Sequence, residues 1–236
     1  MIAMEPIRVL IADDEALVRH ALRIFVDTGG DTTVVGEASD GDEALALAGR
    51  LRPDVVLMDL QMPRVSGIEA TRLITAAFPD VRVLAVTTFS TERHVIPALR
   101  AGASGYLVKD TDPDDILDAI REVAAGRSAM SPRLTRELIL SLQNETEQTH
   151  GASPAPEALT PRELSVVRAI AQGRSNAEIA RELHLAEPTV KANLGRVMTK
   201  WGVRDRVQVL IYAITKHVLE VDSLDLGAGE RREMNG

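Results

Sequence analysis

Short unbroken apolar runs alternate with stretches of helical spacing along residues 7–126 of the chain. Such runs are typical of strands buried on both faces, and apolar residues that recur every three or four positions are typical of amphipathic helices. The runs lie at 7–12, 33–36, 54–59, 81–86 and 105–108, and the helical stretches at 17–28, 41–51, 68–78, 91–101 and 112–125. Five strands alternating with five helices predict an α/β fold with one parallel, doubly wound sheet and helices on both faces.

The third apolar run ends in a carboxylate that is followed by a turn. Val55 to Met58 are apolar, Asp59 follows at once, and Pro63 lies four positions further on. Because proline lacks an N–H and cannot continue a ladder, the chain must turn there. Asp59 is therefore expected at the carboxyl end of a buried strand, where open α/β sheets bind their ligands. An isolated Asp in this place commonly only opens a turn, so the interpretation depends on its neighbours.

Polar residues occupy the corresponding ends of the other strands. Asp13 and Asp14 follow the first strand, Thr87 ends the fourth, and Lys109 follows the fifth. Because the carboxyl ends of parallel strands meet at one edge of the sheet, these groups should converge on Asp59. Clustered carboxylates repel one another and need a cation, and hard oxygen ligands suit Mg²⁺. We therefore expect a magnesium site beside a hydroxyl and an amine.

The pattern changes after residue 130. Residues 131–142 carry apolar residues at helical spacing and predict a linker helix, whereas 143–157 contain almost no large apolar residue and predict a flexible tether. Thr160 to Glu163 form a capping box with proline at the first helical position. Helices are then expected at 161–173, 176–183, 187–201 and 206–218, and the polar tail 221–236 is expected to be disordered. Two short helices joined by a tight turn predict an all-α helix-turn-helix domain over 158–220, behind an α/β domain over 1–130.

The helix at 187–201 has one apolar face and one small, uncharged face. Its core side carries Val190, Leu194, Val197 and Trp201, and its opposite side carries Pro188, Ala192, Gly195 and Thr199. We expect the latter face to enter the major groove of DNA, with Lys191, Arg196 and Lys200 binding mainly phosphates. The expected DNA-binding residues are Thr189, Lys191, Ala192, Asn193, Gly195, Arg196 and Lys200. The next helix carries more apolar surface than one side needs, which predicts dimerisation through Val209, Leu210, Ala213 and Ile214.

Charge is divided unevenly between the two predicted domains. Residues 1–130 contain 13 Lys and Arg against 21 Asp and Glu, whereas residues 161–220 contain 10 against 6. An acidic first domain and a basic second domain favour nucleic-acid binding by the second. The chain has no cysteine, which excludes disulfides and thiol chemistry. Residues 1–6 do not start a signal peptide and no run approaches the ~18 apolar residues of a membrane span, so we expect a cytoplasmic protein without membrane contact.

Residues 7–126 resemble the receiver domain of two-component response regulators, whose five site positions fall on the predicted strand ends in the family's order. The resemblance implies a flavodoxin-like fold in which Asp59 is the phospho-acceptor. It implies that Asp14 binds Mg²⁺ directly and Asp13 through water, with the backbone carbonyl of Gln61 as a further ligand. The remaining roles that it implies are phosphoryl binding by Lys109 and Thr87, a change in exposure of Tyr106, and control of dephosphorylation by Gln61 and Phe89.

Residues 159–217 resemble the DNA-binding domain of the NarL/FixJ, or LuxR-type, regulators. The matching segments are Leu159 to Glu163, Asn176 to Ala180, Thr189 to Lys191 and Gly202 to Arg206. Two positions depart from the family pattern: Ala186 lies where Ser or Thr usually caps the helix, and Asn193 lies where His is frequent. These departures affect which DNA sequence the domain is expected to prefer. They do not change its assignment as a DNA-binding domain.

Together the two resemblances imply a phosphorylation-switched transcription factor. Its expected partners are a sensor histidine kinase, a second copy of the chain when phosphorylated, a two-fold symmetric DNA site, and RNA polymerase as a further candidate. One alternative is a DNA-binding regulator whose receiver only docks partners without phosphorylation. Another is an aspartate-nucleophile phosphatase of the haloacid dehalogenase type, against which Gln61 argues, because those enzymes place a second Asp there.

Overall fold

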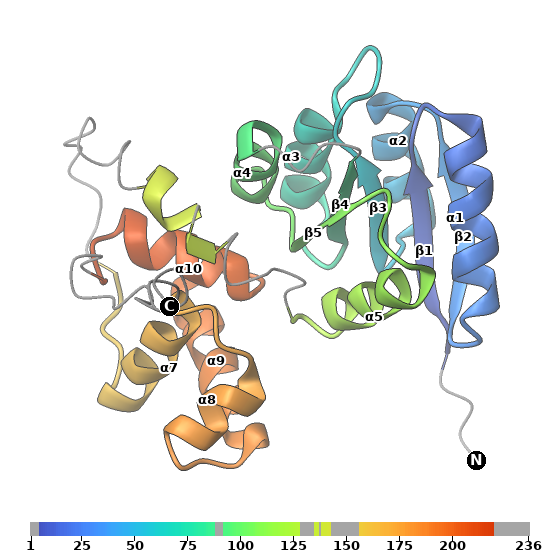
Figure 1. Ribbon diagram of the computed structural model, residues 1–236. Helices are drawn as coiled ribbons and strands as arrows, with labels where there is room; N and C mark the ends of the chain where they lie inside the picture. The colour runs from blue at the N-terminus through green and yellow to red at the C-terminus, as the bar shows by residue number, and fades with distance from the viewer. Residues whose placement is uncertain (1–4, 88–91, 128–134, 137, 143–155, 220–236) are drawn as a thin grey trace, which may run out of the picture. The chain divides into compact units, whose positions relative to one another are not determined.

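The computed structural model describes residues 5–87, 92–127, 135–136, 138–142 and 156–219 (Figure 1). The chain divides into two compact units, residues 1–129 and 130–236. The predicted tether and tail fall largely on 143–155 and 220–236, which lie outside the described residues. Of the predicted linker helix, residues 135–136 and 138–142 are helical, and Leu138 and Ile139 are buried.

The first unit is built on a five-stranded, all-parallel sheet. Its strands are β1 (Ile7–Ala12), β2 (Thr32–Ala38), β3 (Val55–Asp59), β4 (Arg82–Thr87) and β5 (Gly105–Val108). Their order across the sheet is β2-β1-β3-β4-β5, with β3 at the centre. This is the strand order of flavodoxin-like folds, and it confirms the predicted α/β class.

Helices cover both faces of this sheet. They are α1 (Ala16–Thr28), α2 (Gly41–Leu51), α3 (Gly67–Ala77), α4 (Glu92–Arg100) and α5 (Pro113–Ala124). Side chains of a strand point alternately to its two faces. In β1, Val9 and Ile11 pack in the core that α1 and α5 cover, whereas Leu10 and Ala12 pack with α2 and α3 (Figure 1). Burial on both faces explains why the strands read as unbroken apolar runs.

Strand β2 extends two residues beyond its predicted end at Gly36. Glu37 and Ala38 pair with β1, and the register shifts between Val9 and Leu10. A Cβ on Gly36 would lie 2.7 Å from Leu51 Cδ1, so the glycine permits close approach of α2 to the sheet. The sequence interpretation took this glycine as the end of the strand, whereas it serves packing inside the strand.

The second unit is helical. It comprises α7 (Pro161–Ala171), α8 (Asn176–Glu182), α9 (Glu187–Trp201) and α10 (Arg206–Thr215). The predicted capping box at Thr160–Glu163 is present, and a second capping box forms at Ser175–Glu178. The apolar face predicted for α9 is buried, and Trp201 stacks on Tyr212 with ring centroids 4.9 Å apart. The short turn between α8 and α9 confirms the predicted helix-turn-helix.

The apolar residues of α10 build the core of this unit. Val209, Leu210, Ala213 and Ile214, which the sequence interpretation assigned to dimerisation, are all buried. Helix α10 packs against both α7 and α9, so its apolar residues have partners on more than one side within the unit. Arg206, Gln208, Ile211 and Tyr212 are partly accessible and Thr215 is exposed, so these residues remain available for a dimer contact along α10.

Candidate functional site

Three carboxylates meet at the carboxyl edge of the sheet. Asp59 ends β3, and Asp13 follows β1, which pairs directly with β3. Both carboxylates are buried, while Asp14 is exposed, and one oxygen of each of the three lies within 4.8 Å of the others. The convergence predicted from the strand ends is therefore present in the fold.

Lys109 reaches this cluster from β5, across the intervening strand β4. Its Nζ lies 2.7 Å from Asp13 Oδ2, 3.1 Å from Asp59 Oδ2 and 3.3 Å from Glu15 Oε1. Its backbone N–H donates a 2.9 Å hydrogen bond to the carbonyl of Thr87 and so connects the ends of β4 and β5. One ammonium group thus contacts carboxylates from two other strand ends.

Burial and neighbouring charges shift the pKa values of Asp59 and Lys109 in opposite directions. Burial raises the pKa of Asp59, with a further contribution from Asp13, although the hydrogen bond and charge of Lys109 act to lower it. Burial would also lower the pKa of Lys109, but its hydrogen bonds to Asp13 and Asp59 raise it to about 12. Lys109 is therefore firmly cationic at neutral pH, while ionised Asp59 is disfavoured by its surroundings.

The charge balance of the cluster fits a bound cation. Asp13, Asp14 and Asp59 supply three carboxylates against the single ammonium group of Lys109, so negative charge remains in excess among these residues. A set of carboxylate oxygens without nitrogen or sulfur ligands favours hard divalent cations such as Mg²⁺. The acidic cluster can therefore hold a metal ion.

The structure describes three of the other predicted receiver residues, Gln61, Thr87 and Tyr106. The backbone N–H of Gln61 donates a 3.3 Å hydrogen bond to Asp59 Oδ1. Thr87 and Tyr106 are buried on neighbouring strands, and because Ala85 pairs with Tyr106, both side chains point to the same face of the sheet. Burial raises the pKa of the Tyr106 hydroxyl. Phe89 lies outside the described residues.

Two residues near the cluster were missed by the sequence interpretation. Glu15 forms the third contact of Lys109. Its position directly after Asp13 and Asp14 in the sequence could have indicated that it lies near the cluster. Gly67, the first residue of α3, lies against the backbone of Asp59 and donates a 3.2 Å hydrogen bond to Leu60 O. A glycine at a helix start has many explanations, so sequence alone could not single it out.

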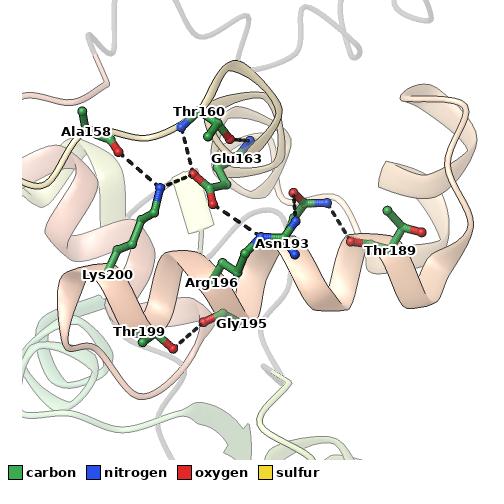
Figure 2. A network of polar contacts seen from close by, with 9 residues as sticks. All are labelled: Ala158, Thr160, Glu163, Thr189, Asn193, Gly195, Arg196, Thr199 and Lys200. Carbon is green, nitrogen blue, oxygen red and sulfur yellow. Dashed lines mark hydrogen bonds and ion pairs between the residues drawn. The ribbon is translucent and has the colours of Figure 1, made fainter.

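In the second unit, the predicted DNA-binding residues of α9 differ in accessibility. Thr189, Lys191, Ala192 and Arg196 are exposed and Gly195 is partly exposed. Asn193 is buried, and its Nδ2 donates a 2.8 Å hydrogen bond to Thr189 O. Lys200 is mostly covered and donates to Glu163 Oε2 at 2.7 Å (Figure 2). Asn193 and Lys200 are thus largely covered by the domain, whereas the other five residues remain accessible.

Glu163 on α7 is a buried carboxylate that connects two helices. Besides closing the capping box, it contacts Lys200 and Arg196 of α9 (Figure 2). The sequence interpretation identified only the capping role, because its partners on α9 lie more than thirty positions away. The hydrogen bond from Lys200, together with that from the Thr160 N–H, lowers the pKa of Glu163 from an ordinary 4.5 to about 2.

This lowered pKa predicts an acid-dependent loss of stability. A carboxyl whose pKa is depressed by folding stabilises the fold above its unfolded pKa and loses that contribution as pH falls through the folded value. The stability difference between wild type and Glu163→Gln should therefore be constant above pH 4.5 and shrink as pH falls toward 2. Denaturant titrations followed by Trp201 fluorescence measure this unit, because Trp201 is the chain's sole tryptophan. A difference that does not change over this interval would contradict the assignment.

Comparison with protein families matches each unit separately. Residues 9–121 match the response regulator receiver domain. Residues 157–213 match the bacterial regulatory proteins of the LuxR family. Among the described residues, no helix is sufficiently long and apolar to cross a membrane.

Known proteins are similar to this chain over more than half of its length. The chain is 42% identical over 216 residues to the uncharacterized transcriptional regulatory protein YxjL of Bacillus subtilis, covering 92% of this chain and 99% of that protein. It is 37% identical to the response regulator protein VraR of Staphylococcus aureus over 91% of this chain and 99% of that protein. A LuxR-family response regulator from Aurantimonas is 37% identical, with a TM-score of 0.54 over 58% of this chain and 98% of that one. The RcsB response regulator of Salmonella typhimurium is 25% identical, with a TM-score of 0.52 over 87% and 98%.

Proposed function

The chain belongs to the two-component response regulators with a LuxR-type DNA-binding domain, which regulate transcription, and from this premise we propose that Asp59 accepts the activating phosphoryl group. The observation that carries the proposal is the contact of Asp59 with Lys109 inside the acidic cluster. A sensor histidine kinase would be the donor. The family assignment leaves no role for the phosphatase alternative.

The residues of the cluster account for the chemistry. A carboxylate oxygen of Asp59 attacks the phosphorus, the bond from phosphorus to the donor breaks, and an acyl phosphate forms. Phosphoryl transfer depends mainly on positioning and on neutralising the charge of the moving group. Lys109, held cationic, supplies one positive charge beside Asp59. Mg²⁺ held by Asp13, Asp14, Asp59 and the Gln61 carbonyl would supply further positive charge.

The switch would pass through Thr87 and Tyr106. A phosphoryl group on Asp59 adds negative charge and acceptor oxygens to which the Thr87 hydroxyl can donate. Thr87 and Tyr106 lie buried on the same face of β4 and β5, so a shift of one changes the space available to the other. We infer that this rearrangement favours a homodimer that binds a two-fold symmetric DNA site and acts on transcription, with RNA polymerase as a further candidate partner.

Binding of DNA should therefore depend on both the phosphodonor and the metal. We expect a small phosphodonor with Mg²⁺ to tighten binding about tenfold, the usual size of coupling between two sites. The probe is the duplex that wild type enriches most from a random-sequence pool, with binding measured by fluorescence anisotropy. A chelator added before the phosphodonor should prevent the change. Equal affinity in all three conditions would favour a receiver that docks partners without phosphorylation.

A further inference from the structure

One flank of α9 carries four residues that share a continuous set of contacts. Thr189, Asn193, Arg196 and Lys200 lie at positions i, i+4, i+7 and i+11 of the helix, and we call them the polar seam. At 100° per residue they lie beside the face of Pro188, Ala192, Gly195 and Thr199 that is expected in the groove. Figure 2 shows the polar seam connected from end to end through the carbonyl of Thr189, the side chains of its other three members, and Glu163.

Glu163 anchors the polar seam from α7. Only 2% of Glu163 is exposed, and its Oε2 accepts hydrogen bonds from Lys200 Nζ at 2.7 Å and from the Thr160 N–H at 2.8 Å. Its Oε1 lies 3.6 Å from Arg196 Nε. A buried carboxylate is costly without such partners, so Glu163 holds both cations against the body of the domain.

Arg196 is fixed along one edge of its guanidinium group. Its Nη2 donates a 2.7 Å hydrogen bond to Asn193 Oδ1, and its Nε faces Glu163. Asn193 is itself fixed, because it is buried and bonded to Thr189 O. The Nε and Nη2 edge therefore faces the protein, while 58% of the Arg196 side chain remains exposed. The opposite edge, formed by Nη1 and the second Nη2 hydrogen, is left to face a ligand.

The two lysines of α9 contrast with Arg196. Lys200 is only 22% exposed and donates to both Glu163 and Ala158 O, so its charge is used inside the domain. Lys191 is 49% exposed and pairs with Glu187 one turn away at 3.3 Å. An exposed pair of this kind contributes little to stability, so Lys191 is easily released to a phosphate.

We propose that Glu163 and Asn193 are positioning residues that present Arg196 to a guanine base in the major groove, whereas Lys200 is a structural cation. A phosphate accepts donors from many directions and does not require a fixed side chain, while O6 and N7 of guanine accept two parallel hydrogen bonds from a planar fork. Fixing the fork in advance reduces the entropy lost on binding. The inference rests on the proposed function, since it assumes that α9 binds DNA.

The test compares two duplexes: the one that wild type enriches most from a random-sequence pool, and a shuffled duplex of the same composition. Arg196→Lys retains the charge but not the fork. We expect the ratio of the two affinities to fall about tenfold, with affinity for the shuffled duplex and the salt slope unchanged. A merely phosphate-binding Arg196 would leave this ratio unchanged, and that result would overturn the proposal.

Glu163→Gln tests the positioning role separately. Glutamine is accepted at this position of a capping box, so the helix start is retained while the anionic partner is lost. The affinity ratio should again fall, without loss of affinity for the shuffled duplex. Parallel loss on both duplexes would indicate a structural role alone and overturn the positioning role of Glu163.

Lys191→Ala and Lys200→Ala are the matched controls. Lys191→Ala should weaken binding to both duplexes alike and reduce the salt slope by about one, whereas Lys200→Ala should leave the slope unchanged. A reduced slope in Lys200→Ala would overturn its assignment as a structural cation. If Lys191→Ala and Arg196→Ala both leave DNA binding unchanged, α9 is not the DNA-binding helix. That result would overturn both this part of the proposed function and the inference.

Discussion

Asp59→Asn should abolish phosphoryl labelling of the chain while leaving the first unit at least as stable as wild type. The amide keeps the size of the side chain but removes the nucleophilic oxygen. Since burial raises the pKa of Asp59, folding disfavours its ionised form, an unfavourable contribution that is present at neutral pH and disappears below the unfolded pKa. A neutral side chain removes this contribution in the absence of a metal.

Labelling with a radioactive small phosphodonor and Mg²⁺, together with thermal unfolding in metal-free buffer, measures both effects. Glu15→Gln is the matched control, because Glu15 also contacts Lys109 but lies exposed at the edge of the cluster. The control should retain labelling. Undiminished labelling of Asp59→Asn would show that another residue accepts the phosphoryl group, and reduced stability would leave misfolding as the cause of lost labelling.

The fold and the acidic cluster were predictable because they follow from strand order. Apolar runs identify strands buried on both faces, and parallel strands place their carboxyl ends at one edge. Asp13, Asp59 and Lys109 could thus be brought together without knowledge of any loop. Contacts that depend on how far a side chain reaches, such as that between Lys109 and Glu15, required the structure.

The contacts of the DNA-binding unit were less predictable because they arise from packing between helices. Helical spacing correctly separated the core face of α9 from its outer face. It could not show that Asn193 turns inward, or that Lys200 is neutralised by Glu163 from α7. Both side chains lie on the flank between the two faces, where a small rotation of the helix decides burial.

The broad apolar surface of α10 likewise depends on packing between helices. An amphipathic helix that packs on one side shows a single stripe, and a broader apolar surface predicts a second contact. The sequence interpretation took that contact to be a second copy of the chain. In the structure, Val209 and Leu210 are buried and α10 contacts both α7 and α9. Two helices of the same unit therefore cover the broad apolar surface of α10.

Gly67→Ala should destabilise the first unit by roughly 3 kcal/mol and strongly reduce labelling of Asp59. A Cβ added at Gly67 would lie 1.7 Å from Asp59 O, 2.7 Å from Asp59 C and 2.9 Å from Leu60 Cα. All three are backbone atoms, so no rotamer change relieves the clash. Either the start of α3 or the end of β3 must move, and the latter carries Asp59, the proposed phospho-acceptor.

Gly195→Ala is the matched control, because Gly195 also lies in a helix but a Cβ there would meet nothing within 4 Å. That substitution should stabilise the second unit by about 1 kcal/mol through the better helix propensity of alanine. Circular dichroism reports unfolding of the first unit in Gly67→Ala, and Trp201 fluorescence reports the second unit in both variants. Wild-type stability and labelling in Gly67→Ala would show that the backbone at the end of β3 can yield. The close approach of α3 would then not be what positions Asp59.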